Sequence, residues 1–250
     1  MKRLLLSILS ATVVFASVMA QDTQVQNRPY TDLRPFHFGV MVGTHLQDIE
    51  FIDRGPQIIT TDDGTVEKIV TVDQDKWDAG FTVGVLGELR LGSHFAFRLA
   101  PAMYFGTRNL TFMNLTDKTG DGENVQKTQQ MKTIYISTAM DLIFSAKRHN
   151  NYRPYIMAGF NPMLNLSGND SDYIKLKRYD LFLELGLGCD FYLPFFKLRP
   201  ELKFCLGLTN NLDTKHAQRF SDPSMADSFM YANSAKESRS KIIALTFYFE

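Results

Sequence analysis

The residues of this chain best placed to do chemistry are ionisable side chains that alternate with apolar ones. In the segment 179–193, Asp180, Glu184 and Asp190 share one face of an extended chain whose other face is apolar. Similar faces recur along the sequence. The full set comprises Glu88, Arg90, Arg98, Asp141, Arg153, Arg178, Asp180, Glu184, Asp190, Arg199, Glu201 and Lys203.

Two uses fit such a set, in which both signs of charge are present in similar number. The first is a network of salt bridges and hydrogen bonds that satisfies charges buried inside the fold. The second is a pair of carboxylates that performs acid–base catalysis. No spacing singles out one pair, so we expect the salt-bridge network and predict no catalytic residue.

Three other groups could bind a metal or form a disulfide. His37 and His94 fall on the charged faces and could form a metal pair, but we expect ordinary structural histidines. The acidic loop 117–123 lacks the repeated acidic spacing of an EF-hand, so we expect a solvated turn. Cys189 and Cys205 are predicted on opposite faces and unpaired. We therefore predict no cofactor, no metal ligand and no small-molecule substrate.

The elements that position these residues follow a period of two, which is typical of β-strands. In 179–193 the odd positions are apolar from Tyr179 to Leu193, and the even positions carry charge and glycine. Seven further segments repeat the pattern. They are 36–42, 77–91, 95–105, 134–144, 152–166, 198–208 and 243–249.

Alternation fits either a soluble barrel with polar residues outside or a membrane barrel with apolar residues outside. Several of the segments are longer than an ordinary strand and suit a tilted membrane crossing. Short connections, at 92–93, 147–151 and 194–196, alternate with longer ones at 47–76, 111–131, 167–177 and 211–238. Aromatic residues gather beside the short turns. These features predict an all-β fold: an eight-stranded antiparallel transmembrane β-barrel of outer-membrane type, with four long outer loops and short periplasmic turns.

Two prolines complicate this prediction. Pro101 and Pro162 fall within expected strands, where each removes one ladder hydrogen bond. A β-bulge is one solution there, and the strand register beside these residues stays open.

The first residues predict export. Lys2 and Arg3 precede an apolar stretch from Leu4 to about Val18, and Ala20 ends a small-residue cleavage pattern. We expect a signal peptide at 1–20, a periplasmic segment at 21–34 and the barrel at 35–250. An even strand count would leave both termini in the periplasm. The 27 basic and 27 acidic residues balance, which argues against a nucleic-acid partner.

Two stretches carry a family resemblance. The stretch 34–39, Arg-Pro-Phe-His-Phe-Gly, resembles the opening strand of PorT-like proteins, and 190–197 with 200–204 resembles their hairpin between the sixth and seventh strands. Glu250 departs from the terminal aromatic residue common in such barrels. The resemblance implies a non-enzymatic outer-membrane component of the type IX secretion system, which exports proteases and adhesins that bear a C-terminal sorting domain. Its partners would be outer-membrane lipid and other secretion components.

Two other functions stay open. One is a generic structural or adhesin-like outer-membrane barrel. The other is a lipid-modifying enzyme or protease of the outer membrane, which would need a cluster of polar residues at one membrane depth. The apolar faces offer almost no polar residues away from their ends, so we expect no enzyme.

Overall fold

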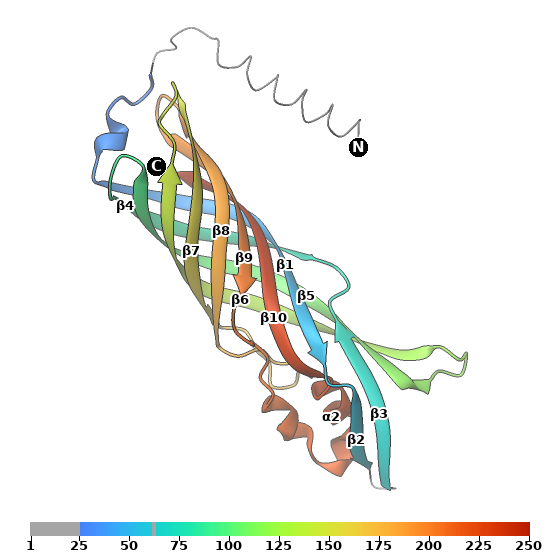
Figure 1. Ribbon diagram of the computed structural model, residues 1–250. Helices are drawn as coiled ribbons and strands as arrows, with labels where there is room; N and C mark the ends of the chain where they lie inside the picture. Colours follow the sequence, from blue (N-terminus) through green and yellow to red (C-terminus); the bar gives the residue numbers. More distant parts are fainter. Residues whose placement is uncertain (1–25, 62–63) are drawn as a thin grey trace, which may run out of the picture.

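The computed structural model describes residues 26–61 and 64–250 and contains one antiparallel sheet that closes on itself (Figure 1). Eight strands form the closed ring: β1 (Phe36–Asp53), β4 (Asp78–Arg90), β5 (Phe95–Lys118), β6 (Asn124–Ser145), β7 (Tyr152–Asn165), β8 (Tyr179–Tyr192), β9 (Lys197–Gly207) and β10 (Ala235–Phe249). The ring follows the order β5-β4-β1-β10-β9-β8-β7-β6, and pairing of β5 with β6 closes it. The predicted eight-stranded barrel is confirmed.

Side chains alternate between the two faces as the period of two predicts. In β8, Asp180, Phe182 and Glu184 are buried inside the ring, whereas Leu185 and Leu187 are exposed outside it. Because successive strand residues point to opposite faces, a closed ring with an apolar exterior encloses the polar face of every strand.

The strand register, which the sequence left open beside Pro101 and Pro162, runs past both prolines without a bulge. Between β4 and β5 the pairing resumes from Gly84↔Ala102 to Gly87↔Leu99 without a shift, across Pro101. Pro162 interrupts the β6–β7 pairing in the same way. A proline lacks an N–H, so each one opens the ladder on one side only, and the pairs on either side hold the register.

The long connections are more regular than the sequence predicted. Much of 47–76 and 111–131 is strand: β1, β5 and β6 run on beyond the ring, and β2 (Pro56–Thr61) and β3 (Gly64–Asp73) form a hairpin whose second strand joins β5. The connection 211–238 contains the 3-10 helices η3 (His216–Phe220) and η4 (Pro223–Met225) and the helix α2 (Ala226–Ala232). The short 3-10 helix η2 (Thr31–Leu33) precedes the first strand.

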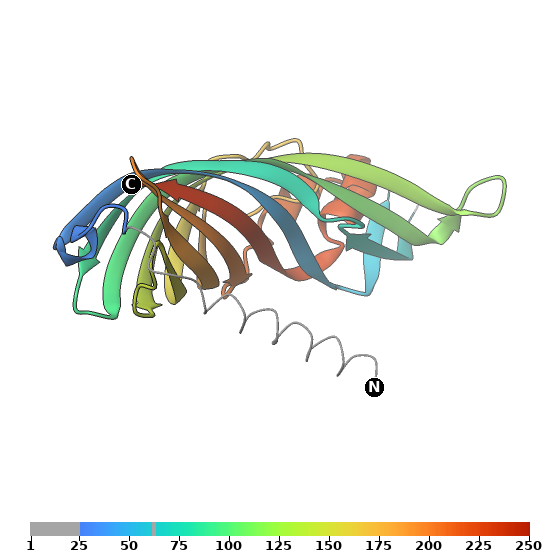
Figure 2. The same ribbon diagram turned by 90° about the horizontal axis from the view of Figure 1, so that it is seen from above.

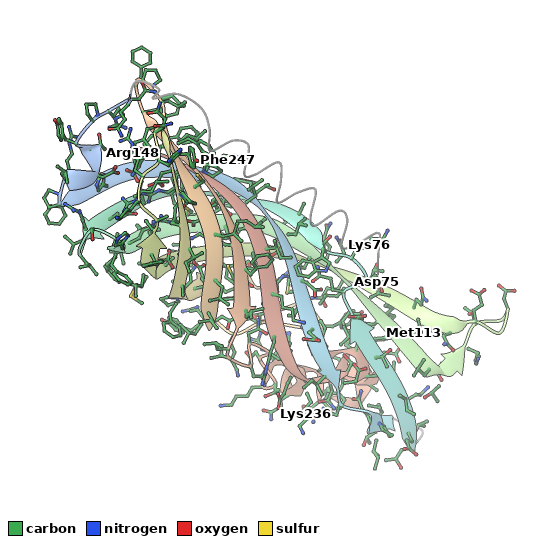
Figure 3. All side chains as sticks on the ribbon, turned by 45° about the horizontal axis from the view of Figure 1, so that its top comes forward. Asp75, Lys76, Met113, Arg148, Lys236 and Phe247 are labelled. Carbon is green, nitrogen blue, oxygen red and sulfur yellow. The ribbon has the colours of Figure 1, made fainter. Side chains whose placement is uncertain are left out.

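The molecule therefore has two unlike ends. The short turns and the C-terminus lie at one end, which we call the short-turn end, and Arg148 and Phe247 mark it in Figure 3. The strand extensions, the β2–β3 hairpin and α2 lie at the other end, which we call the long-loop end and where Figure 3 labels Met113 and Lys236. Figure 2 shows the β5–β6 hairpin projecting beyond the rest of that end.

No helix within 26–61 and 64–250 is long and apolar enough to cross a membrane. The predicted signal peptide at 1–20 lies outside the described residues.

Candidate functional site

The middle of the barrel interior holds five buried charged residues, which we call the central charge cluster: Arg98, Asp141, Glu184, Glu201 and Lys203. Arg98 Nη1 lies 2.7 Å from Glu201 Oε2. Lys203 Nζ lies 3.4 Å from Glu201, 3.3 Å from Glu184 and 3.7 Å from Asp141. Each carboxylate therefore faces a cation, which is the arrangement that makes buried charge tolerable.

Neutral donors complete the environment of Glu201. The hydroxyl of Tyr155 donates to its Oε2 over 2.6 Å, and that of Tyr248 donates to Oε1 over 3.2 Å. The guanidinium of Arg98 also lies 4.6 Å from the centre of the Tyr248 ring. A Cβ at Gly188 would overlap the Tyr155 phenol, so glycine at this inward position lets the tyrosine reach Glu201.

A second group, the short-turn charge cluster, lies between the first and the short-turn end: Glu88, Asp190, Lys197, Arg199 and Glu250. Arg199 contacts Glu88 and Asp190, and its Nη1 lies 3.3 Å from Glu250. Lys197 pairs with Glu250. The two clusters join where Arg98 Nε approaches Glu88 Oε2 at 3.4 Å.

The segment just before β1 lies against the short-turn end of the barrel. The guanidinium of Arg148 stacks 3.6 Å from the centre of the Tyr192 ring and donates to the carbonyl of Asn27. The Tyr192 hydroxyl donates to Asp32, which belongs to η2. These contacts fix residues 27–33 against the mouth of the barrel.

The cavity at this mouth has a volume of only about 20 Å³. His37, Glu88, His94 and Arg199 are among the side chains that line it. A water needs roughly 10–15 Å³ of this kind of space, so the cavity has room for about one water molecule and not for a substrate.

On the other side of the central charge cluster, polar groups continue the network towards the long-loop end. Arg108 Nη1 donates to Ser240 Oγ over 2.9 Å, and its Nε donates to Gln47 Oε1 over 3.2 Å. The amide of Asn211 then links Ser240 to Asp180, at 2.7 and 3.0 Å.

A separate hydrophobic core, which we call the cap core, closes the long-loop end. It unites residues from eight segments: Ile49, Ile59, Val70, Val72, Leu110, Phe112, Met131, Ile174, Leu176, Leu212, Met230, Tyr231 and Ala235. Phe112 is fully buried, with its ring centre 5.7 Å from both Tyr173 and Tyr231. The connections expected to be loops thus form a packed layer over the barrel.

A surface contact joins two of these connections. Asp170 pairs with Lys175 and, at 2.7 Å, with Arg219 of η3. Hydrogen bonds from Arg219 and Lys175 hold the pKa of the Asp170 carboxyl well below its usual range. The side chains of Asp170 and Arg219 are exposed and that of Lys175 is partly exposed, so these two ion pairs contribute little to stability.

Most of the charged residues predicted to face inward are buried there. They are Glu88, Arg98, Asp141, Asp180, Glu184, Asp190, Arg199, Glu201 and Lys203. Arg90 and Arg153 are partly exposed, and Arg153 lies at the short-turn mouth. Arg178 is exposed, because it precedes β8 and the alternation does not reach it.

Lys197 and Glu250 also lie in the interior, although neither was predicted there from the sequence. Lys197 fell between the predicted turn 194–196 and the predicted strand 198–208, but it is the first residue of β9 and is buried. Glu250 follows Phe249, so one more step of the alternation would have placed it inside the barrel.

The histidines and the acidic loop form separate polar contacts. His37 Nδ1 lies 3.3 Å from Glu250, whereas His94 Nδ1 lies 2.9 Å from the carbonyl of Ser145. Lys68 hydrogen-bonds to Asp117 and holds the pKa of that carboxyl below its usual range. Among the described residues, no group of three or more His, Cys, Asp or Glu side chains is placed to hold a metal. Cys189 and Cys205 are free.

A closed eight-stranded ring with a polar, filled interior and an apolar exterior is what a lipid-embedded barrel requires. A family model described as the outer membrane protein beta-barrel domain matches residues 19–213. The chain belongs to this family. It is an outer-membrane β-barrel protein, as the alternation and connection lengths predicted.

The solved structures that are similar to this chain include those of three outer-membrane proteins. OprG from Pseudomonas aeruginosa has a TM-score of 0.46 and 12% identity, covering 85% of this chain and 93% of its own. Neisserial surface protein A has a TM-score of 0.41 and 10% identity, with 86% and 98% covered. Ail of Yersinia pestis has a TM-score of 0.36 and 10% identity, with 86% and 99% covered. No curated protein sequence matches the chain.

The lipid-facing surface follows from this membership. Leu185, Leu187 and Ile156 are exposed near the middle of β8 and β7. Exposed aromatic residues gather at the short-turn end and include Phe36, Phe38, Phe95 and Phe144, whereas Trp77 and Tyr179 are exposed nearer the long-loop end. These two groups occupy the positions of interfacial girdles.

Leu185→Arg tests this assignment. The change places a charge near the middle of the lipid-facing band and should cost about 2–4 kcal/mol in the free energy of unfolding, measured by urea denaturation in lipid vesicles. The matched control is Leu166→Arg, which follows the end of β7 at the long-loop side and should cost about 0–1 kcal/mol. Equal costs at both positions would mean that Leu185 does not face lipid.

Proposed function

We propose that this barrel is a non-enzymatic scaffold of the outer membrane that passes no solute along its axis. The filled interior is the observation that carries the proposal. The two charge clusters occupy the lumen from the short-turn end to its middle. The hydrogen bonds of Arg108 continue from there towards the long-loop end, which the cap core covers. A protein built this way acts through its surfaces.

The proposal includes an orientation. Outer-membrane barrels have short periplasmic turns and longer extracellular loops. We therefore propose that the short-turn end and both termini face the periplasm after cleavage of a signal peptide at 1–20, and that the cap is extracellular.

A narrower proposal is that the scaffold serves the type IX secretion system. The stretches 34–39 and 190–197, which carry the resemblance to PorT-like proteins, lie far apart in sequence but converge at the short-turn end. His37, Asp190 and Lys197 line the same small cavity there. Beside it, Tyr30, Leu33 and Phe195 are 79%, 59% and 92% exposed. Exposed apolar side chains at a periplasmic rim support docking of a periplasmic secretion component.

Secretion by a complemented deletion strain tests both the scaffold proposal and the narrower type IX proposal. Phe195→Ser should lower secretion of a protease that bears the sorting domain, because it removes the most exposed apolar side chain of the rim. The double change Arg98→Met/Glu201→Leu should leave secretion unchanged, because it removes one lumen charge of each sign and alters no surface. The assay is secreted protease activity at matched abundance of the barrel in the outer membrane.

The outcomes distinguish the scaffold proposal from the type IX proposal. Normal secretion in the deletion strain would rule out the type IX role and leave the scaffold proposal standing. Loss of secretion in Arg98→Met/Glu201→Leu, with normal secretion in Phe195→Ser, would contradict the scaffold proposal and point to work inside the lumen.

A further inference from the structure

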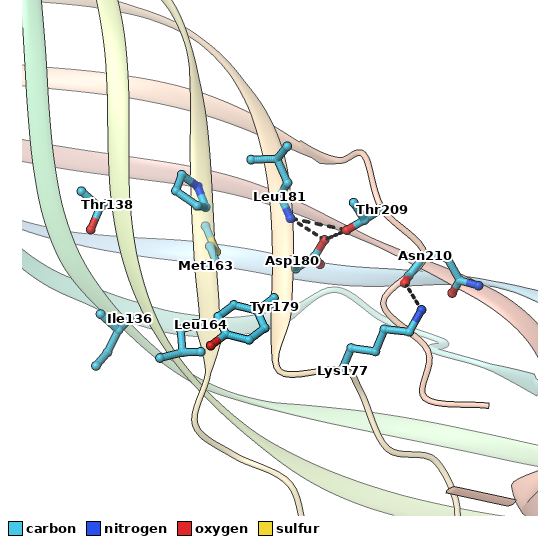
Figure 4. Close-up of a pocket in the computed structure, with 11 residues that line it drawn as sticks. Ile136, Thr138, Met163, Leu164, Lys177, Tyr179, Asp180, Leu181, Thr209 and Asn210 are labelled. Atoms are coloured by element: carbon cyan, nitrogen blue, oxygen red, sulfur yellow. Dashed lines mark hydrogen bonds between the residues drawn. The ribbon is translucent and has the colours of Figure 1, made fainter. Parts of the chain in front are cut away.

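A hollow in the outer surface of the barrel lies near the long-loop end (Figure 4). The hollow, which we call the outward pocket, has a volume of about 600 Å³ and lies over β6, β7 and β8. Ile136, Leu164, Tyr179 and Leu181 form its apolar walls, and Thr138 and Pro162 lie between them. Its volume falls within the range of pockets that hold small ligands.

The hollow has a cause in the sequence. Pro162 leaves the β6–β7 ladder unpaired between Ser137↔Met163 and Met140↔Phe160. By the same register, Thr138 stands opposite Pro162, so two small outward residues face each other. Elsewhere on these strands the outward positions carry larger side chains, such as Ile156, Phe160, Met140 and Leu142. The outer surface is therefore recessed at Thr138 and Pro162, and the larger side chains around them stand out further.

The rim of the pocket towards the long-loop end is polar, and its exposed charged residue is Lys177. Asp180 also lines the pocket, but it is buried and accepts hydrogen bonds from Thr209 and Asn211. Lys177 is exposed, and its Nζ donates to the carbonyl of Asn210 over 2.8 Å, which holds the ammonium beside the pocket (Figure 4). An ammonium has three donors, so two remain for another acceptor. Arg178 follows and is also exposed.

The pocket thus combines an apolar hollow that faces lipid with cations at its interfacial edge. Tyr179, which is 74% exposed, marks this edge as a membrane interface, where amphipathic aromatic rings gather. The matching molecule has an acyl chain for the hollow and a negative headgroup for the ammonium. A neutral apolar solute would leave Lys177 without a counter-charge.

We propose that the outward pocket binds one acyl chain of an anionic, phosphate-bearing membrane lipid, whose headgroup contacts Lys177. The site lies outside the barrel and does not depend on the type IX role. Bound in this way, the lipid fills the depression that Pro162 and Thr138 leave and ties the connection 166–178 to the bilayer surface.

Native mass spectrometry of the detergent-purified full chain tests the proposal. The probes are dioleoyl phosphatidic acid and dioleoyl phosphatidylcholine, which share their acyl chains and differ in headgroup. One phosphatidic acid per barrel should be retained, with a preference of about threefold to fivefold over phosphatidylcholine, as expected for a single exposed ion pair.

Two pairs of variants assign the two halves of the site. Thr138→Trp fills the hollow and should abolish retention of both lipids, whereas Leu187→Trp, an outward change elsewhere on β8, should leave it intact. Lys177→Gln should remove the headgroup preference but keep acyl binding, and Lys236→Gln, at an exposed lysine outside the pocket, should keep both. Heat-modifiable migration on gels confirms that each variant is folded.

The proposal fails if Thr138→Trp retains lipid as well as Leu187→Trp does, because the lipid then binds elsewhere. It also fails if phosphatidic acid and phosphatidylcholine are retained equally by the wild-type chain. A stable dimer in place of a lipid adduct would assign the pocket to a second copy of the chain and would overturn it as well.

Discussion

Glu201→Leu should destabilise the barrel by about 3–5 kcal/mol, the cost of breaking a buried ion pair by removing one partner. Glu201 accepts from Arg98 and Tyr155 and contacts Lys203, all in the water-poor middle of the lumen. Without it, Arg98 loses its 2.7 Å ion pair and keeps only the 3.4 Å approach to the carboxylate of Glu88. The measurement is the free energy of unfolding from reversible urea denaturation in lipid vesicles.

Two controls separate burial from charge. Glu50→Leu breaks a solvent-exposed pair with Lys241 and should cost less than about 1 kcal/mol. The double change Arg98→Met/Glu201→Leu removes both partners and should recover much of the stability lost in Glu201→Leu, because apolar side chains of similar volume replace the pair. If Glu201→Leu costs no more than Glu50→Leu, the central charge cluster is hydrated and the lumen is not sealed.

The barrel itself could be predicted from the sequence, because one physical constraint fixes it. A strand with lipid on one side must be apolar at every second residue, and the segment 179–193 shows this without interruption. The same alternation placed Glu184, Glu201 and Lys203 inside the barrel. It could not say which of these charges meet, because that depends on strand stagger, which the alternation does not encode.

The long-loop end could not be predicted in this way. Outside the lipid, the strand extensions need no apolar face, and segments such as 124–132 alternate only weakly and read as polar connections. The strands β2 and β3 are held by pairing with each other and with β5, and α2 by contacts with distant residues. Tertiary packing decides the structure of such segments, and local sequence does not show it.

Pro162 illustrates the same limit. The sequence shows that a ladder bond must be missing there, but it does not show whether the strand bulges or the ladder simply opens. In the structure the β6–β7 ladder opens at Pro162, and the strand register is the same on both sides of the gap. The small residues at this gap become visible as a surface feature only when Thr138 is seen opposite the proline.

Phe112→Ala should open the cap while leaving the barrel folded. Phe112 comes from the extension of β5, and its ring packs against Tyr173 of the connection 166–178 and Tyr231 of α2. Truncating a fully buried phenylalanine costs about 3–5 kcal/mol. The cap is a separate core built on loops and strand ends, so this loss should appear as local opening and not as global unfolding.

Limited proteolysis of the protein in lipid vesicles measures this opening. Cleavage within 213–225 should become much faster in Phe112→Ala, whereas the urea transition of the barrel should hardly move. Ile58→Ala, at a cap residue that is 76% exposed, should leave both unchanged. Because the charge clusters fill the lumen between the cap and the short-turn end, Phe112→Ala should still conduct no ions across a planar bilayer. An open channel in that variant would show that the cap alone seals the lumen, and the scaffold proposal would then give way to a gated pore.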